Sequence, residues 1–274
     1  MHVAGRPPFR CLSRLRTPPV ATRLLGDTAM RDSLVIVPTY NEAGNLVKLV
    51  PAILALGLFD VLVVDDNSTD GTGVLAELLA TEYPGCVRVI HRPGKLGLGT
   101  AYLRGFAYAL ASGYERIFEM DADFSHDPYC LPELRRALSE ADVVLGSRYV
   151  KGGGTRHWPQ LRKLISQGGS RYAGLVLGLP FHDLTGGFKG FSRRALASLD
   201  LDTIRSNGYS FQIEVTYRLY QQGFHIVERP IVFEDRRVGK SKMSWRIVAE
   251  AVLMVWKLRL TRAVPGEALG EAHT

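Results

Sequence analysis

The sequence is poor in cysteine, with Cys11, Cys86 and Cys130 the three examples in 274 residues. They are widely spaced and form no CxxC pair, which excludes a disulfide framework and a cysteine-rich zinc site and fits a reducing cytoplasm. The sequence also lacks any apolar run close to the roughly 20 residues that a membrane-spanning helix needs. We therefore expect a chain that does not cross a membrane by its own sequence.

An excess of basic residues is present, but it is unevenly distributed. The net charge is +7, and residues 1–31 hold six arginines against one aspartate. The remainder is close to neutral, so charge does not predict a nucleic-acid partner. Residues 1–30 lack the apolar core of a secretory signal. We expect a disordered basic leader, a transit peptide, or a start placed upstream of the true one at Met30.

From Ser33 onward, short Val/Ile/Leu runs alternate with segments of helical period. This pattern predicts βαβ units around a mostly parallel sheet flanked by helices, an α/β fold. The expected strands cover residues 34–37, 61–64, 87–91, 117–120, 143–145 and 226–233, and the expected helices cover residues 45–56, 72–82, 100–112, 131–139 and 160–177. We expect one catalytic domain over residues 31–243, a helix over 244–262 and a disordered tail over 263–274.

Three of the expected strands end in acidic or polar residues, in segments 38–42, 65–68 and 121–123. Ligands of open α/β sheets bind beyond the carboxyl ends of the strands, so these segments should converge on one site. So many carboxylates need a cation or strong donors to offset their repulsion. The pattern therefore favours a bound divalent ion.

Asp121 and Asp123 are the best candidates for ion ligands. In an extended chain, residues two apart leave the same face, and paired carboxylates suit Mg²⁺ or Mn²⁺ bridging to a diphosphate. The alternative is a solvated turn with capping acids. A triplet of this kind is weak alone and gains weight from the neighbouring acidic strand ends.

Other polar residues offer further contacts, each with a plainer alternative. Asp65 or Asp66 can accept paired N–H bonds from a nucleobase, and turn formation is the alternative for both. Glu42 can accept further bonds and Tyr40 can stack on the base, although helix capping is a serious alternative for Glu42. Arg148, and Arg236 with Lys242, are placed to bind phosphate, although most such residues are solvated. The candidates are therefore complementary to a nucleotide.

Residues 246–261 predict a helix that is apolar over most of its circumference. Core packing is slightly favoured for an isolated helix of this kind. The alternative is a membrane-surface helix or a docking site for an integral-membrane partner, with Trp256, Arg259 and Arg262 at the interface.

These motifs carry a family resemblance over residues 34–243. The matching blocks are residues 37–42, 63–72, 96–102, 119–126, 146–149, 183–190, 208–214 and 239–243. The chain resembles the inverting family-two glycosyltransferases of the dolichol-phosphate mannosyltransferase and polyprenol monophosphomannose synthase type. The resemblance implies a GT-A fold, GDP-mannose as donor, a polyprenyl or dolichyl phosphate as acceptor, and Mg²⁺ or Mn²⁺ as cofactor. It also implies a peripheral enzyme at the cytoplasmic face of the membrane.

The resemblance assigns roles by position. It implies nucleoside contacts from Pro38, Tyr40, Glu42, Val64 and Asp66, metal ligands at Asp121 and Asp123 with backbone from Ala122, donor-phosphate contacts from Arg236 and Lys242, and acceptor-phosphate contacts from Arg148, Arg162 and Ser166. Asp121, Asp123 and Arg148 are the expected catalytic residues. Ser125 stands where some relatives have Gln as a further metal ligand, so water or a weaker hydroxyl contact is expected there.

No residue stands out as a general base. A phosphate acceptor is already ionised near neutral pH and needs none, whereas a hydroxyl acceptor does. Two alternatives stay open: the same reaction with another nucleotide sugar such as UDP-glucose, and a non-catalytic nucleotide-sugar sensor or scaffold.

Overall fold

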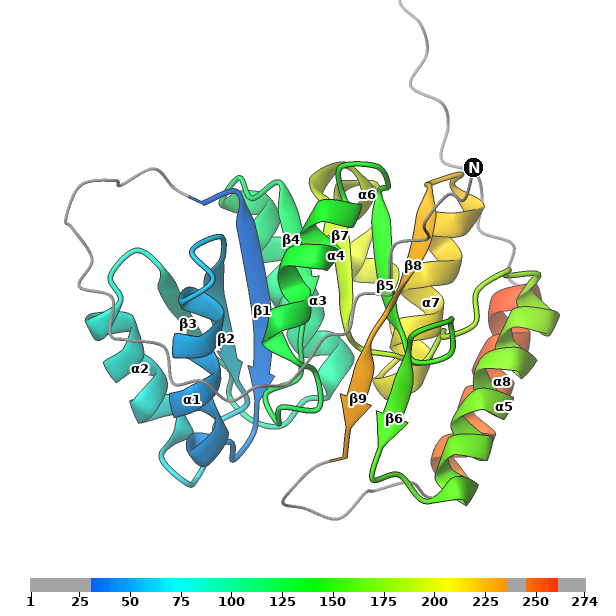
Figure 1. Cartoon of the computed structure of the whole chain (residues 1–274), viewed down its shortest axis with the longest axis horizontal. Helices are drawn as coiled ribbons and strands as arrows, with labels where there is room; N and C mark the ends of the chain where they lie inside the picture. Colours follow the sequence, from blue (N-terminus) through cyan, green and yellow to red (C-terminus); the bar gives the residue numbers. More distant parts are fainter. Residues whose placement is uncertain (1–30, 236–244, 261–274) are drawn as a thin grey trace, which may run out of the picture.

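The computed structural model describes residues 31–235 and 245–260 (Figure 1). The expected leader over 1–30, the expected tail over 263–274, and the candidates Arg236, Lys242 and Arg262 lie outside the described residues.

A seven-stranded sheet in the order β3-β2-β1-β4-β7-β5-β8 forms the centre of the molecule. Its strands are β1 Ser33–Thr39, β2 Asp60–Asp65, β3 Val87–His91, β4 Arg116–Glu119, β5 Val143–Ser147, β7 Lys189–Ser192 and β8 Ile226–Pro230. Every pairing is parallel except those of β7, which runs antiparallel between β4 and β5. The prediction of a mostly parallel sheet is confirmed.

Helices cover both faces of this sheet (Figure 1). They are α1 Ala43–Leu54, α2 Thr72–Glu82, α3 Leu98–Ala111, α4 Leu131–Ala137, α5 Gln160–Leu177, α6 Arg193–Ala197, α7 Gly208–Gln221 and α8 Trp245–Leu260, with short 3-10 turns at Pro128–Cys130 and Leu201–Thr203. Because side chains alternate along a strand, β1 contributes to two hydrophobic cores, one on each face of the sheet. Val35 and Val37 pack in one core, and Leu34 and Ile36 pack in the other. Burial on both faces explains why these strands are continuous apolar runs.

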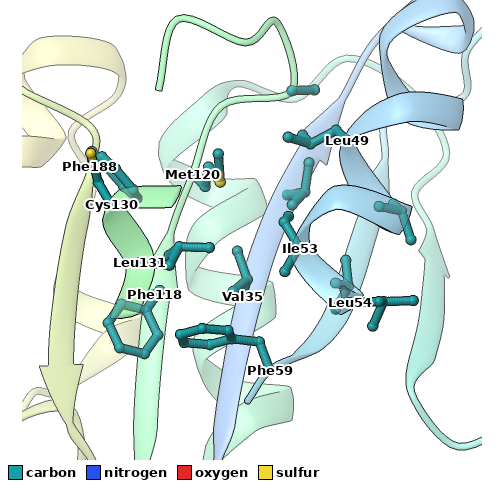
Figure 2. Packing of buried hydrophobic residues seen from close by; sticks show 14 of the residues in the cluster. Val35, Leu49, Ile53, Leu54, Phe59, Phe118, Met120, Cys130, Leu131 and Phe188 are labelled. Atoms are coloured by element: carbon teal, nitrogen blue, oxygen red, sulfur yellow. The ribbon is translucent and has the colours of Figure 1, made fainter. Parts of the chain in front are cut away.

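The core beside α1 and α4 is closely packed. Figure 2 shows Val35 of β1 among Leu49 and Ile53 of α1 and the ring of Phe59. Phe59 meets Phe118 of β4 edge-to-face, with ring centroids 5.5 Å apart. This packing lies beneath β1 and β4, which pair in parallel, so the candidate site residues that follow the two strands leave the same edge of the sheet.

The later half departs from the prediction in two places. The single strand expected over residues 226–233 is two strands in different sheets, β8 and then β9 Val232–Glu234, which pairs with β6 Gly154–Arg156. The change follows Pro230, which has no N–H for a continuing ladder. Strand β7 was not predicted, because the short stretch Lys189–Ser192 has no alternating apolar pattern.

The C-terminal helix expected over residues 246–261 is present as α8, which packs against α5 and α7. Val255 and Leu258 are buried, whereas Leu253 and Leu260 are 71% and 78% exposed. Core packing therefore accounts for one face of α8 and leaves the other uncovered among the described residues.

Candidate functional site

Asp121 and Asp123 follow β4 at the carboxyl edge of the sheet, as predicted, but the chain there is not extended. The strand ends at Glu119, and residues 122 and 123 form a turn. The expectation that both carboxylates leave one face of a strand is wrong for this reason. The turn itself orders the pair: Tyr102 donates to Asp121 Oδ1 at 3.3 Å, and the Ser125 N–H donates to Asp123 Oδ1 at 3.0 Å.

His126 is hydrogen-bonded to the backbone of Asp121. Its Nδ1 accepts a hydrogen bond from the Asp121 N–H at 3.2 Å, and its ring stacks on Phe188 with centroids 4.8 Å apart. The side chain is buried, and burial lowers the pKa of His126 although Asp121 and Asp123 oppose this shift. A neutral, buried imidazole that is already bonded positions the acid pair and is poorly placed to take a proton from a substrate.

The donor set fits a hard divalent cation. Asp121 and Asp123 supply carboxylate oxygens, the ligand type that Mg²⁺ and Mn²⁺ prefer. The Ser125 hydroxyl is buried without a hydrogen-bond partner within the described residues, so an oxygen next to the pair is left for an ion or its water. In residues 31–235 and 245–260 no cluster of three or more His, Cys, Asp or Glu suits a metal. The acid pair and the Ser125 hydroxyl thus offer oxygen donors to a cation at this edge of the sheet.

The two neighbouring carboxylates after β2 have different environments. Asp65 accepts from Thr39 Oγ1 at 2.9 Å and from the Ser68 N–H at 3.0 Å, so it holds the loops together. Asp66 has Arg92 Nη1 2.8 Å from its Oδ1, and burial raises the pKa of Asp66 although Arg92 opposes the shift. A buried carboxylate with a raised pKa gains from new N–H donors, so Asp66 is the better base-binding candidate.

The other nucleoside-binding candidates lie at the ends of β1 and β2, at the same edge of the sheet as Asp66. Tyr40 is 39% exposed, and Lys95 Nζ lies 4.0 Å from its ring centroid. Glu42 occupies the N-cap position of α1 without a side-chain capping bond, so the capping alternative is wrong for its side chain. Pro38 is partly exposed at the end of β1. Val64 is fully buried, so its side chain does not face the site and any contact would come from its backbone.

Arg148 follows β5 and is almost fully buried. Its Nε and Nη2 donate to the two oxygens of Asp183 at 2.7 and 2.6 Å, and Nη2 also donates to Thr185 Oγ1 at 3.0 Å. Burial alone would lower the pKa of Arg148, but the bonds to Asp183 hold it above its ordinary value. The guanidinium is thus a permanently charged group in a fixed orientation.

Arg162 and Ser166 lie on α5, and the structure brings both close to Arg148. Arg162 donates to Asp235 Oδ1 at 2.6 Å, and Ser166 Oγ accepts from Tyr149 Oη at 2.7 Å. The Trp158 ring lies 4.2 Å from Arg162 Cζ and 5.4 Å from Arg148 Cζ. We call Arg148, Arg162, Ser166, Tyr149 and Trp158 the cation cluster.

Phe233 joins the acid pair to the cation cluster. Its ring meets His126 at 5.4 Å and Trp158 at 5.2 Å, both edge-to-face, and lies 5.5 Å from Arg148 Cζ. Because His126 holds Asp121, the pair and the cluster belong to one continuous site.

Sequence reasoning missed several of these residues: Arg92, Lys95, Tyr149, Trp158, Asp183, Thr185, Phe233 and Asp235. Arg92 was recognisable in principle, because it directly follows a strand that ends at the same sheet edge. Most of the others act through contacts between segments far apart in the sequence, such as Asp183 with Arg148, which carry no local signal.

Comparison with known proteins agrees with this geometry. Residues 34–200 match the family described as glycosyl transferase family 2. A polyprenol monophosphomannose synthase of Mycolicibacterium smegmatis is 46% identical over 83% of this chain and 87% of its own. An undecaprenyl-phosphate mannosyltransferase of Micrococcus luteus is 48% identical over 81% of this chain and 91% of its own.

Solved structures establish the fold. A glucosyl-3-phosphoglycerate synthase of Mycobacterium tuberculosis, in complex with Mn²⁺ and UDP, aligns with a TM-score of 0.59 at 21% identity over 84% of this chain and 80% of its own. The mannosyltransferase PcManGT of Pyrobaculum calidifontis, in complex with GDP-Man and Mn²⁺, aligns with a TM-score of 0.58 at 19% identity over 87% of this chain and 66% of its own. The molecule has the GT-A fold.

Proposed function

The chain belongs to glycosyl transferase family 2, and we propose that it transfers mannose from GDP-mannose to a polyprenyl phosphate, with inversion at the anomeric carbon. The names of its relatives support this acceptor and this sugar. The observation that carries the proposal is the joining of an acid pair to a cation cluster through His126 and Phe233. Such a site can hold a diphosphate ion complex and a second phosphate side by side.

The residues that follow the strands would bind the nucleotide sugar. Asp121 and Asp123 would hold Mg²⁺ or Mn²⁺, with Ser125 beside them. The bound ion supplies positive charge that stabilises the departing diphosphate. Asp66 and Tyr40 would bind the base. Further donor-phosphate contacts are proposed for Arg236 and Lys242, which are outside the described residues.

The cation cluster would bind the acceptor. Arg148, Arg162 and Ser166 would bind the acceptor phosphate and direct one oxygen toward the anomeric carbon. A phosphate monoester has a second pKa of about 6, so this oxygen attacks without losing a proton to the protein. The burial of His126 is consistent with a reaction that needs no protein base. Positioning and leaving-group stabilisation then supply the catalysis.

A transfer assay tests the proposal. Polyprenyl phosphate is offered with labelled GDP-mannose or labelled UDP-glucose, with and without Mn²⁺ or Mg²⁺, and label is followed into the lipid phase. We expect a metal-dependent mannolipid. Label from UDP-glucose alone would replace the sugar assignment, and no lipid product under any condition would leave the sensor or scaffold alternative.

We also propose that the enzyme acts at the cytoplasmic surface of the membrane, bound directly or through an integral-membrane anchor. None of the helices in residues 31–235 and 245–260 combines the length and apolarity that crossing a bilayer requires. Helices α5 and α8 lie side by side at one end of the molecule (Figure 1). Both expose large apolar side chains, with Leu164 and Leu175 on α5 67% and 85% exposed, beside Leu253 and Trp256 on α8.

Vesicle co-sedimentation tests this surface without removing α8, whose Val255 and Leu258 belong to the core. The double variant Leu253→Ser/Leu260→Ser should lose vesicle binding and keep its thermal stability. Val74→Ser/Leu78→Ser on α2 changes two residues that are 69% and 61% exposed and is the matched control. Equal binding by both variants would remove the direct membrane role of α8.

A further inference from the structure

Trp158 carries an unexplained polar group. Its indole Nε1 is buried and has no hydrogen-bond partner within the described residues. Buried donors are nearly always paired, because an unmade hydrogen bond costs about 1–3 kcal/mol. A tryptophan kept for packing alone gains nothing from this N–H, so the group is left for a partner beyond the described residues, such as a ligand.

The ring of Trp158 is also unusual in its neighbours. Arg162 lies over it at 4.2 Å and Arg148 lies near it at 5.4 Å, while Phe233 closes its edge. Two guanidinium groups repel each other, and attraction to the same electron-rich ring offsets part of that repulsion. The indole therefore holds both cations in one place.

Each of the two cations keeps donors for a ligand. Arg148 uses Nε and Nη2 for Asp183 and Thr185, and Arg162 uses Nη1 for Asp235. A guanidinium has five N–H donors, so neither is exhausted by these bonds. A ligand with several acceptor oxygens and negative charge suits this arrangement, and a phosphate monoester is such a ligand.

We propose that Trp158 is an acceptor-binding residue, whose ring holds Arg148 and Arg162 together and whose Nε1–H donates to an oxygen of the polyprenyl phosphate. The proposal rests on the proposed function, because it takes the cation cluster as the acceptor-phosphate site. It adds a neutral donor to the charged ones. A neutral N–H fixes the orientation of the phosphate without adding positive charge to a region that already holds two guanidinium groups.

Two substitutions separate the ring from the N–H. Trp158→Phe keeps an aromatic face for the guanidinium groups and removes the donor, whereas Trp158→Leu removes both. With a short-chain, water-soluble polyprenyl phosphate, Trp158→Phe should raise the acceptor KM roughly 10- to 100-fold, the usual range for a hydrogen bond to a charged group. Trp158→Leu should raise it further. The donor KM and the thermal midpoint of Trp158→Phe should stay near wild type.

Tyr83→Phe is the matched control, because it deletes an aromatic donor at the end of α2, away from the site. An unchanged acceptor KM in Trp158→Phe would overturn the proposal, and so would equal increases in the donor and acceptor KM. A weakened affinity for GDP would also overturn it, since that would assign the N–H to the donor phosphates.

Calorimetric titration of the same acceptor into donor-free protein makes the test independent of turnover. If wild type binds the acceptor and transfers no sugar, the proposed function fails while Trp158 is still tested by its effect on binding. Weaker acceptor binding by Trp158→Phe supports the inference. Equal binding by the two proteins, or no acceptor binding by wild type, overturns it.

Discussion

The acid pair and the cation cluster hold their charges in different ways. Asp121 and Asp123 lie in a tight turn directly after β4, where Asp121 accepts from Tyr102 of α3 and Asp123 accepts from the Ser125 N–H. Arg148 is instead held by a carboxylate 35 residues away, and Arg162 by one 73 residues away. The acidic side is built locally on strand ends, and the basic side is assembled from distant segments by ion pairs and aromatic rings.

This difference predicts how substitutions in the acid pair and in the cation cluster will affect stability and substrate binding. The strands that lead to the acid pair rest on a packed core that includes the Phe59–Phe118 contact, so single polar substitutions after these strands should cost little stability. The basic side depends on its own ion pairs for its geometry. Substitutions there should affect folding and acceptor binding together when the pair is buried, and acceptor binding alone when the pair is exposed.

The largest effect is expected for Asp183→Asn. The Arg148–Asp183 pair is buried, with 5% and 0% of the side chains exposed, so the change leaves a buried cation short of its charge partner. Removing one partner of a buried pair typically costs about 3–5 kcal/mol. We expect a loss of that size in the free energy of unfolding, measured by urea denaturation.

Asp235→Asn is the control for this comparison. It makes the same chemical change in the partly exposed Arg162–Asp235 pair, where the cost should be about 0–1 kcal/mol. Equal losses of stability in the two variants would show that burial does not distinguish the pairs.

The second effect concerns the acid pair. Asp121→Asn and Asp123→Asn should each lower kcat by about 10²–10³, the scale for losing one stabilising group at a developing charge, with little change in the free energy of unfolding. Steady-state kinetics across a Mn²⁺ titration measures this loss. The control is Asp202→Asn, which makes the same change at an exposed residue in the Leu201–Thr203 turn. Near-normal turnover in both site variants would show that the metal binds elsewhere.

The same contrast explains how much the sequence predicted. The five strands of the first half are visible as apolar runs, three of them followed by acidic or polar segments, and the structure places these segments at the carboxyl edge of the sheet as predicted. Strand β7 is different, because it combines a buried lysine with Gly190, where a Cβ would lie 2.7 Å from the Phe118 ring. Close approach to a residue 72 positions earlier leaves no local pattern.

The cation cluster shows the same limit for the site. Arg148, Arg162 and Ser166 were assigned by resemblance, and the structure brings them together. The residues that hold them there, Trp158 and Asp183 among them, could not be found from spacing, because their roles arise from tertiary contacts.

The smallest expected effects are changes in KM, and they test most directly whether the acidic residues bind the donor and the cation cluster binds the acceptor. Asp66→Asn should raise the donor KM about tenfold without changing the acceptor KM, because it weakens a charge-assisted contact to the base. Arg162→Met keeps an unbranched side chain but removes the guanidinium that lies over Trp158, and it should raise the acceptor KM about tenfold without changing the donor KM. Measuring both constants for both variants gives a two-by-two comparison. If each variant raised the donor KM and the acceptor KM equally, donor binding and acceptor binding would be coupled. The acid pair and the cation cluster would then differ in structure but not in which substrate they bind.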